Sequence, residues 1–348
     1  MQRAIRYFVA AAGVVLTAAP VFAQVYPERV DGRTTRVHEV YRRRDRGGDR
    51  AQAVDKFTKT VHIGADGTLD VSNIAGDIIV SKGSGSEAKI DVVRTARGRD
   101  DADAKEQLSL TRVDITEGNG RAEVRERYPE RNGNNGGRHN WSVTSDFTIT
   151  APPGTHLILK SVSGNLKIAG ITGDVAAETV SGDVEISAAG RVTTAKSISG
   201  NVVVSDTKFD GALEAGSISG DVKLQRVTAR RVSIGSVSGN VQLDDVQSER
   251  VDAHTTSGNA NFSGTLARSG RYELKSFSGE VRLTLSGDVG FELEASSFSG
   301  DVRSDLPITT HGTSDDHRRR RSLSGTYGDG SAVLNISTFS GSVVISKR

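Results

Sequence analysis

Residues 161–187 read SVSGNLKIAGITGDVAAETVSGDVEIS and contain two copies of a short signature, Ser-Gly followed by Asn or Asp. This signature, with Glu as a third choice after the glycine, recurs from about residue 157 to residue 305 at intervals of 18 to 21 residues. A period near twenty is typical of a solenoid, in which each repeat forms one coil that buries its apolar residues by stacking on its neighbours. The repeated glycines are Gly164, Gly182, Gly200, Gly220, Gly239, Gly258, Gly279 and Gly300.

The spacing of apolar residues within a repeat predicts at least two short strands per coil. Relative to each glycine, apolar residues occur at positions −7, −5, −2, +2 and +4, and mainly polar residues separate them. Such alternation has the period of a β-strand, so we expect all five columns to point inward along the solenoid axis. One coil shows the pattern with Val232, Ile234, Val237, Val241 and Leu243.

The cross-section of the coil follows from a second regularity. In some coils a sixth apolar position at +7, as in Ile171, makes the apolar intervals run 2, 3, 4, 2, 3 and 4 residues. A half-repeat used twice favours a flattened coil with two similar faces, although a three-sided coil remains an alternative. The predicted fold is therefore all-β, a β-solenoid of 18–21-residue coils whose core is made of Val, Ile, Leu and Ala, since aromatic residues are only 5% of the chain.

Polar columns follow the same period. Positions −3 and −1 are nearly always Ser or Thr, as in Ser236 and Ser238. Because these residues flank position −2, we expect them to point outward as a ladder of hydroxyls that bond to turn backbone. An ice-binding face is an alternative, but such faces use the methyl group of Thr, which Ser lacks.

Position +1 holds Asn, Asp or Glu in every repeat from Gly164 to Gly300. Carboxylates stacked about 4.8 Å apart could bind calcium. Asn separates most of the acids, however, so we favour the simpler role of capping the turn that the preceding glycine opens. No metal site and no cofactor are predicted.

The N-terminus is typical of an exported protein. Residues 1–23 have a basic start, an apolar run and a small-residue cleavage site, as in a signal peptide. The apolar run is shorter than the roughly 20 residues that a membrane-spanning helix needs, so we expect no transmembrane span in the mature chain. We expect the protein in the periplasm, on the cell surface or secreted. The polar, arginine-rich residues 24–56 are interpreted as a linker.

Composition narrows the possible partners. The chain has no cysteine, which excludes disulfides and a lipid anchor on a processed cysteine. Loss of Arg3 and Arg6 with the signal peptide would leave equal numbers of basic and acidic residues. A net charge near zero argues against general nucleic-acid binding.

Residues 57–154 are expected to form the first coil and a β-rich capping insertion. Leu69, Val71, Gly76, Ile78 and Val80 repeat the spacing of the later coils. The following residues, which separate this coil from the next, show strand patterns and one short helical segment at 100–108. We expect this insertion to cover the first coils, because solenoid ends need capping.

This arrangement resembles the bacterial putative-adhesin domain of unknown function, a β-solenoid family of envelope and exported proteins. The resemblance rests on the early Gly76-Asp77 coil, the interrupting strands, the strand that ends in Ala151-Pro152-Pro153-Gly154, and the ladder of Ser-Gly-Asn/Asp coils. It covers about residues 57–348. It implies surface adhesion and carries no catalytic residues over to this chain.

The repeat solenoid is expected over residues 155–348, with one interruption. Gly300 and Gly341 are 41 positions apart, which is room for an extra coil, but Arg318 and Arg320 would then take its inward positions. Buried arginines are costly, so we predict that residues 309–330 form an exposed loop and that the coil of Gly341 stacks on the coil of Gly300. An extra coil remains the alternative. The possible patch for an anionic partner is Arg318, Arg319, Arg320 and Arg321.

For function, the sequence favours an exported, non-catalytic, adhesin-like protein that presents a repetitive face to an envelope polymer or protein. A carbohydrate-active enzyme is one alternative, because long β-helices host lyases and glycosidases. Such enzymes gather carboxylates in a groove, whereas position +3 here is mixed, as in Lys167, Glu185 and Gln242. An accessory or sensor of envelope stress is the other alternative.

Overall fold

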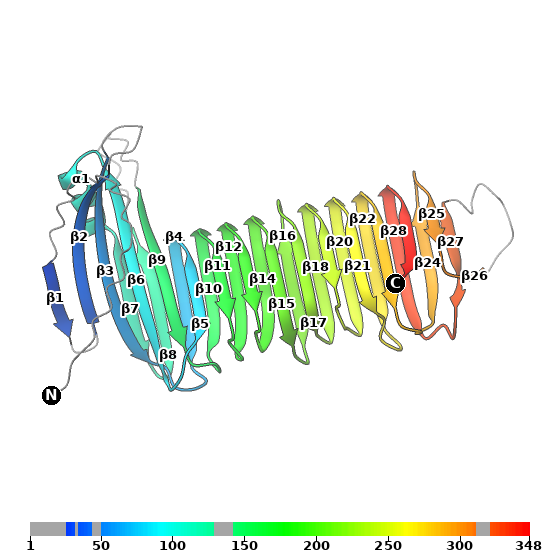
Figure 1. Ribbon diagram of the computed structural model, residues 1–348, viewed down its shortest axis with the longest axis horizontal. Helices are drawn as coiled ribbons and strands as arrows, with labels where there is room; N and C mark the ends of the chain where they lie inside the picture. The colour runs from blue at the N-terminus through cyan, green and yellow to red at the C-terminus, as the bar shows by residue number, and fades with distance from the viewer. Residues whose placement is uncertain (1–25, 32–33, 44–49, 129–141, 311–320) are drawn as a thin grey trace, which may run out of the picture.

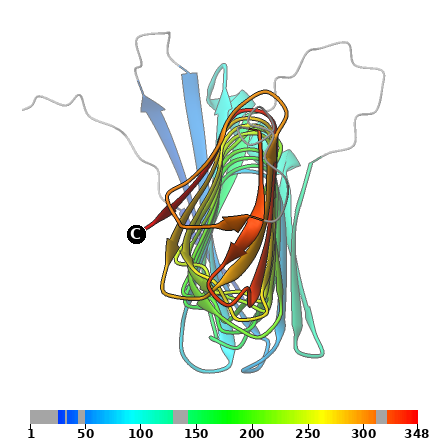
Figure 2. The same cartoon turned by 90° about the vertical axis from the view of Figure 1, so that its right-hand side faces the viewer.

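The computed structural model describes residues 26–31, 34–43, 50–128, 142–310 and 321–348 as a long β-solenoid (Figure 1). The described residues form two sheets, sheet A with 15 strands and sheet B with 14, and one helix, α1 (Asp101–Leu110). Viewed along the axis, the coils superpose as a flattened loop (Figure 2). The prediction of an all-β solenoid is confirmed, and its coils have two faces. The predicted signal peptide lies outside the described residues.

The two sheets run the length of the molecule. From the N-terminal end, sheet A is ordered β1 (Tyr26–Asp31), β2 (Thr34–Arg43), β3 (Arg50–His62), β6 (Glu87–Gly98), β9 (Val143–Ala151), β5 (Ile78–Lys82), β11 (Leu166–Ala169), β13 (Val184–Ser187), β15 (Val202–Lys208), β17 (Val222–Thr228), β19 (Val241–Asp244), β21 (Ala260–Thr265), β23 (Val281–Ser286), β29 (Val343–Lys347) and β25 (Val302–Ser304). Sheet B is ordered β7 (Arg112–Gly118), β8 (Arg121–Arg127), β4 (Thr68–Ala75), β10 (His156–Ser163), β12 (Asp174–Ser181), β14 (Arg191–Ser199), β16 (Ala212–Ser217), β18 (Arg231–Ser238), β20 (Arg250–Ser257), β22 (Arg271–Ser278), β28 (Ala332–Ser340), β24 (Phe291–Ser297), β27 (Ser322–Tyr327) and β26 (Thr309–Thr310).

Each coil of the repeat contributes one strand to each sheet, and equivalent residues of neighbouring coils pair in parallel. Val232 pairs with Val251 in sheet B, and Val241 pairs with Ala260 in sheet A. Except for the half-buried Thr193 and Ser304, residues at −7, −5, +2 and +4 of the repeats are buried between the two sheets and form one continuous core. Four of the five predicted inward columns are therefore confirmed.

The predicted orientation at the corner between the two strands is wrong. Ser236, at −3, is only 3% exposed, and its hydroxyl donates to the carbonyl of Gly220 in the preceding coil at 2.9 Å. Val237, at −2, is 48% exposed. The strand alternation of −7 and −5 continues to −3, so position −2 must point outward. The hydroxyl satisfies a carbonyl that the core would otherwise leave unpaired.

The glycine of the signature is required by close stacking. A Cβ on Gly239 would collide with the carbonyl oxygen of Gly220, and every equivalent glycine from Gly164 to Gly341 is crowded in the same way. Beside this contact, the +1 side chains bond along the axis. The amide of Asn240 donates to Oδ1 of Asp221 at 2.7 Å, for example. The +1 column thus links successive coils, where the sequence predicted a cap within each turn.

The N-terminal region differs from the expected linker. Residues 26–31, 34–43 and 50–62 form β1, β2 and β3, which extend sheet A as antiparallel strands. Asp55 of β3 forms ion pairs with Arg36 of β2 and with Arg94 of β6. A polar composition therefore does not prevent pairing here. With β6, β7, β8, β9 and α1, these strands form a cap that covers the first coil (Figure 1).

At the other end, the order of the coils differs from the order of the chain. β28 lies between β22 and β24, and β29 lies between β23 and β25. The last coil therefore stacks on the coil of Gly300, as predicted, but on the side that faces the coil of Gly279. Residues 309–330 are not simply a loop, because β26 and β27 pair antiparallel with each other and β27 pairs with β24. This hairpin covers the edge that β24 would expose.

Candidate functional site

The reversed corner creates an unbroken row of outward side chains along sheet B, here called the apolar ridge. Equivalent strands stack about 4.8 Å apart, so its ten positions span about 43 Å. Nine of the ten are exposed large apolar residues, whereas soluble monomers rarely expose long contiguous apolar surfaces. In order along the axis the ridge is Ile74, Val162, Val180, Ile198, Ile218, Val237, Thr256, Phe277, Phe339 and Phe298.

The C-terminal end of the apolar ridge is aromatic. The rings of Phe277 and Phe339 stack at 4.9 Å between centroids and 2° between planes. Phe298 stacks on the other side of Phe339 at 4.7 Å and 5°. Phe298 is also 65% exposed, the most of any large apolar residue on the ridge. Three parallel rings at this spacing form a rigid, water-facing apolar surface.

The N-terminal end of the apolar ridge is fixed by a buried carboxylate of the cap. Glu126 on β8 accepts hydrogen bonds from the amide of Ile74 at 2.7 Å and from the hydroxyl of Ser145. Burial raises the pKa of Glu126, although these donors and the charge of Arg94 oppose the rise. The bonds hold the first ridge residue in line with the coils that follow.

The side chains along the apolar ridge are suited to binding an apolar surface. The exposed neighbours at −1 are serines, and in the described part of the chain no group of three or more His, Cys, Asp or Glu residues could hold a metal. The ridge itself contains no titratable residue. These features suit reversible binding of an apolar surface.

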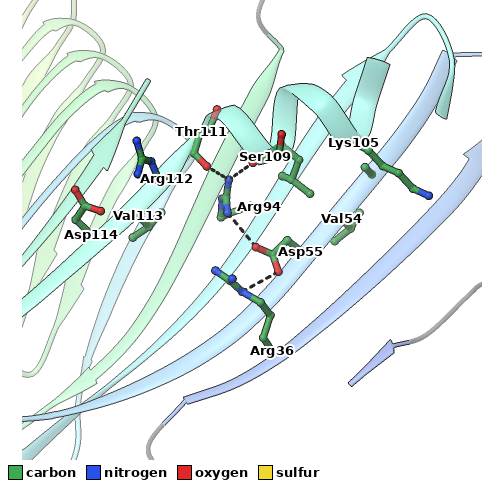
Figure 3. Close-up of a pocket in the computed structure, with 12 residues that line it drawn as sticks. Arg36, Val54, Asp55, Arg94, Lys105, Ser109, Thr111, Arg112, Val113 and Asp114 are labelled. Carbon is green, nitrogen blue, oxygen red and sulfur yellow. Dashed lines mark hydrogen bonds and ion pairs between the residues drawn. The ribbon is translucent and has the colours of Figure 1, made fainter. Parts of the chain in front are cut away.

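A second feature is a pocket in the cap, of about 580 Å³, between sheet A and the segment from α1 to β7 (Figure 3). Arg94 lies at its centre, with a side chain only 5% exposed, and forms an ion pair with Asp55 at 3.0 Å. The same guanidinium donates to the carbonyls of Leu108 and Thr111. Arg36 reaches Asp55 from β2 at 3.3 Å. The network fastens α1 and β7 to sheet A.

The predicted anionic-partner patch is only partly described. Arg318, Arg319 and Arg320 lie outside the described residues, while Arg321 is exposed and its carbonyl accepts the amide of Ser297. The sequence analysis missed a row of three arginines. Each is the first residue of one of three neighbouring strands of sheet B, and the three pair with one another in register. No carboxylate of the described chain forms an ion pair with them. Alignment of the repeats at −8 identifies this row as Arg231, Arg250 and Arg271.

Solved structures of bacterial proteins resemble this chain at low identity. A putative adhesin of Bacteroides fragilis is 14% identical, with a TM-score of 0.39 over 84% of this chain and 97% of that one. A putative lipid binding protein of Parabacteroides distasonis is 15% identical, with a TM-score of 0.43 over 84% of this chain and 96% of that one. A putative cell adhesion protein of Clostridium sporogenes is 12% identical, with a TM-score of 0.25 over 84% of this chain and 99% of that one.

The match to a protein family is more specific. No curated protein matches the chain. The family model described as Toastrack DUF4097 matches residues 173–346, half of the chain and most of the repeat. This match agrees with the resemblance seen in the Ser-Gly-Asn/Asp ladder, and the chain belongs to the Toastrack DUF4097 family.

Proposed function

We propose that the protein is a non-catalytic, adhesin-like binding protein of the cell envelope that holds a partner protein along the apolar ridge. The observation that carries the proposal is the row of nine exposed apolar side chains, ending in three stacked phenylalanines. Burying apolar surface is favourable by about 25 cal/mol per Å², so a complementary groove on a partner would gain affinity from the whole length of the row.

The test compares two triple variants. Phe277→Ser, Phe298→Ser and Phe339→Ser together remove the aromatic end of the apolar ridge. Ser278→Ala, Ser299→Ala and Ser340→Ala change the adjacent exposed serines and serve as the matched control. Purified proteins are titrated against isolated envelopes of the source bacterium. We expect the phenylalanine variant to lose about tenfold or more in affinity, because buried aromatic residues dominate binding energies, and the control to bind as the wild type does. Equal binding by both variants would contradict the proposal.

The rival enzymatic function predicts a different readout. A polysaccharide lyase or glycosidase would release unsaturated sugars or new reducing ends from a polysaccharide panel. We expect no such release by the purified protein. Release that depends on any carboxylate of the cap pocket would replace the proposed function with catalysis.

Export is part of the proposal. It is supported by the signal-peptide pattern of residues 1–23. Separately, the one helix in the described part of the chain is too short and polar to cross a membrane. Mass spectrometry of the protein recovered from envelope or medium should find Gln24 as the first residue. An intact N-terminus in the cytosolic fraction would count against export.

We further propose Arg318–Arg321 as a patch for an anionic partner. Four consecutive arginines attract polyanions through their summed charge. Their replacement by glutamine should weaken binding of polyphosphate at low salt. The same test on Arg231, Arg250 and Arg271 compares the two basic segments, and a loss confined to these three would reassign the patch to them.

A further inference from the structure

The acids of the cap pocket are already engaged. Asp55, 1% exposed, lies between Arg36 and Arg94. Asp114, at the mouth, forms an ion pair with Arg127 at 2.7 Å. Neither carboxylate is therefore available as the main contact for a cationic or metal ligand.

Some of the basic side chains that line the pocket have unused capacity for ion pairs or hydrogen bonds. Lys105 on α1 and Arg112 on β7 are exposed and form no ion pair with any described carboxylate. Nε of Arg94 is buried without a hydrogen-bond partner, and buried polar groups in folded proteins normally have one. Figure 3 shows Lys105 and Arg112 on opposite sides of Arg94, so the pocket has one unpaired cation on each side. Nε of Arg36 also lacks a hydrogen bond, but it lies 3.3 Å from Asp55 in an ion pair, which leaves Nε of Arg94 as the donor open to a ligand.

Of the other six lining residues, four are apolar, and Ser109 and Thr111 are polar. Ala53, Val54 and Leu108 are buried, and Val113 is half-buried at the mouth. A volume of about 580 Å³ lies within the roughly 300–1,000 Å³ of pockets that hold small molecules. The walls suit a ligand with an apolar body, while the cations suit a ligand with one anionic end.

We propose that the cap pocket binds a small amphiphilic carboxylate, with its apolar body against Leu108 and Val113 and its carboxylate near Arg112. The site lies in the cap and is separate from the apolar ridge, so this inference goes beyond the proposed function and does not depend on it.

Calorimetric titration with four probes tests the ligand chemistry. Decanoate carries both features, decanol keeps the body without the charge, decylamine reverses the charge, and acetate keeps the charge without the body. We expect decanoate to bind about tenfold or more tighter than each of the others, the equivalent of one charge-assisted contact or of several buried methylenes. Equal affinity for decanol or decylamine would overturn the proposal, as would the absence of decanoate binding.

Variants locate the site. Arg112→Gln is a surface change that should leave the fold intact, and it should weaken decanoate binding several-fold without changing decanol binding. Arg97→Gln removes an exposed cation of the same cap that does not line the pocket, and it should bind decanoate as the wild type does. Weakening by Arg97→Gln equal to that by Arg112→Gln would reduce the effect to general charge and contradict the proposed site.

Discussion

In the repeat, successive coils pair in the same way with their neighbours, so each stabilising contact is one of many of its kind. In the cap, one buried network of Arg36, Asp55 and Arg94 joins β2, β3, β6 and the end of α1. The same two sheets run through both regions, yet the repeat is held by apolar columns and hydroxyl bonds, whereas the cap adds a buried charge network to its apolar core. The comparison predicts that the loss of unfolding free energy on substitution depends more on whether the residue lies in the cap or in the repeat than on the type of residue.

The largest effect is expected in the cap. Asp55→Ala would leave the buried Arg94 without its counter-charge, and breaking a buried ion pair in this way costs about 3–5 kcal/mol of unfolding free energy. Urea unfolding followed by circular dichroism measures the loss. The double variant Asp55→Ala, Arg94→Leu should recover part of it, because no unpaired charge then remains. A double variant as unstable as the single one would show that the charge is not the cause.

A smaller effect is expected in the repeat. Ser236→Ala removes the hydroxyl that satisfies the carbonyl of Gly220 and should cost about 1 kcal/mol. Ser238→Ala, two residues further on, changes an exposed serine and should cost less than about 0.5 kcal/mol. Equal losses in urea unfolding would show that the two hydroxyls lie in similar environments, against the structure.

The junction of the two regions should respond to pH. Burial raises the pKa of Glu126 above its ordinary value of 4.5, so the folded state keeps a proton that the unfolded state releases. The stabilisation by this proton is full below pH 4.5 and is lost as the pH rises through the folded-state pKa. Glu126→Gln should remove this dependence, so the free-energy difference between variant and wild type should shift in favour of the variant from acid to neutral pH. A shift in the opposite direction would mean that the pKa is lowered.

Much of the repeat could be predicted from the sequence, because the columns at −7, −5, +2 and +4 follow both hydrophobicity and strand period. At position −2 the two signals conflict, and hydrophobicity alone places Val237 inside. The strand period, which packing obeys, places Ser236 inside. For this reason the sequence analysis could not identify the candidate site. The apolar ridge consists of the residues at −2, which their hydrophobicity assigns to the core.

Two other features could not be predicted, for different reasons. Polar composition suggests a linker for residues 24–56, but the described parts of this segment form strands, and Arg36 pairs with Asp55 across two of them. The position of the last coil in the stack could not be predicted, because neighbouring coils present equivalent residues. Val343, for example, pairs with both Val281 and Val302. The pocket of the cap depends on contacts between residues far apart in the chain, such as Asp55 and Arg94, which no local pattern encodes.

The central claim, that the apolar column at −2 faces water while the hydroxyl column at −3 is buried, can be tested by thiol labelling. The chain contains no cysteine, so the single variants Val237→Cys and Ser236→Cys each carry one reporter. The account predicts that Cys at position 237 reacts with a water-soluble maleimide in the folded protein nearly as fast as in urea. Cys at position 236 should react only on unfolding. Protection at 237 together with rapid reaction at 236 would contradict the orientation of the corner and, with it, the apolar ridge.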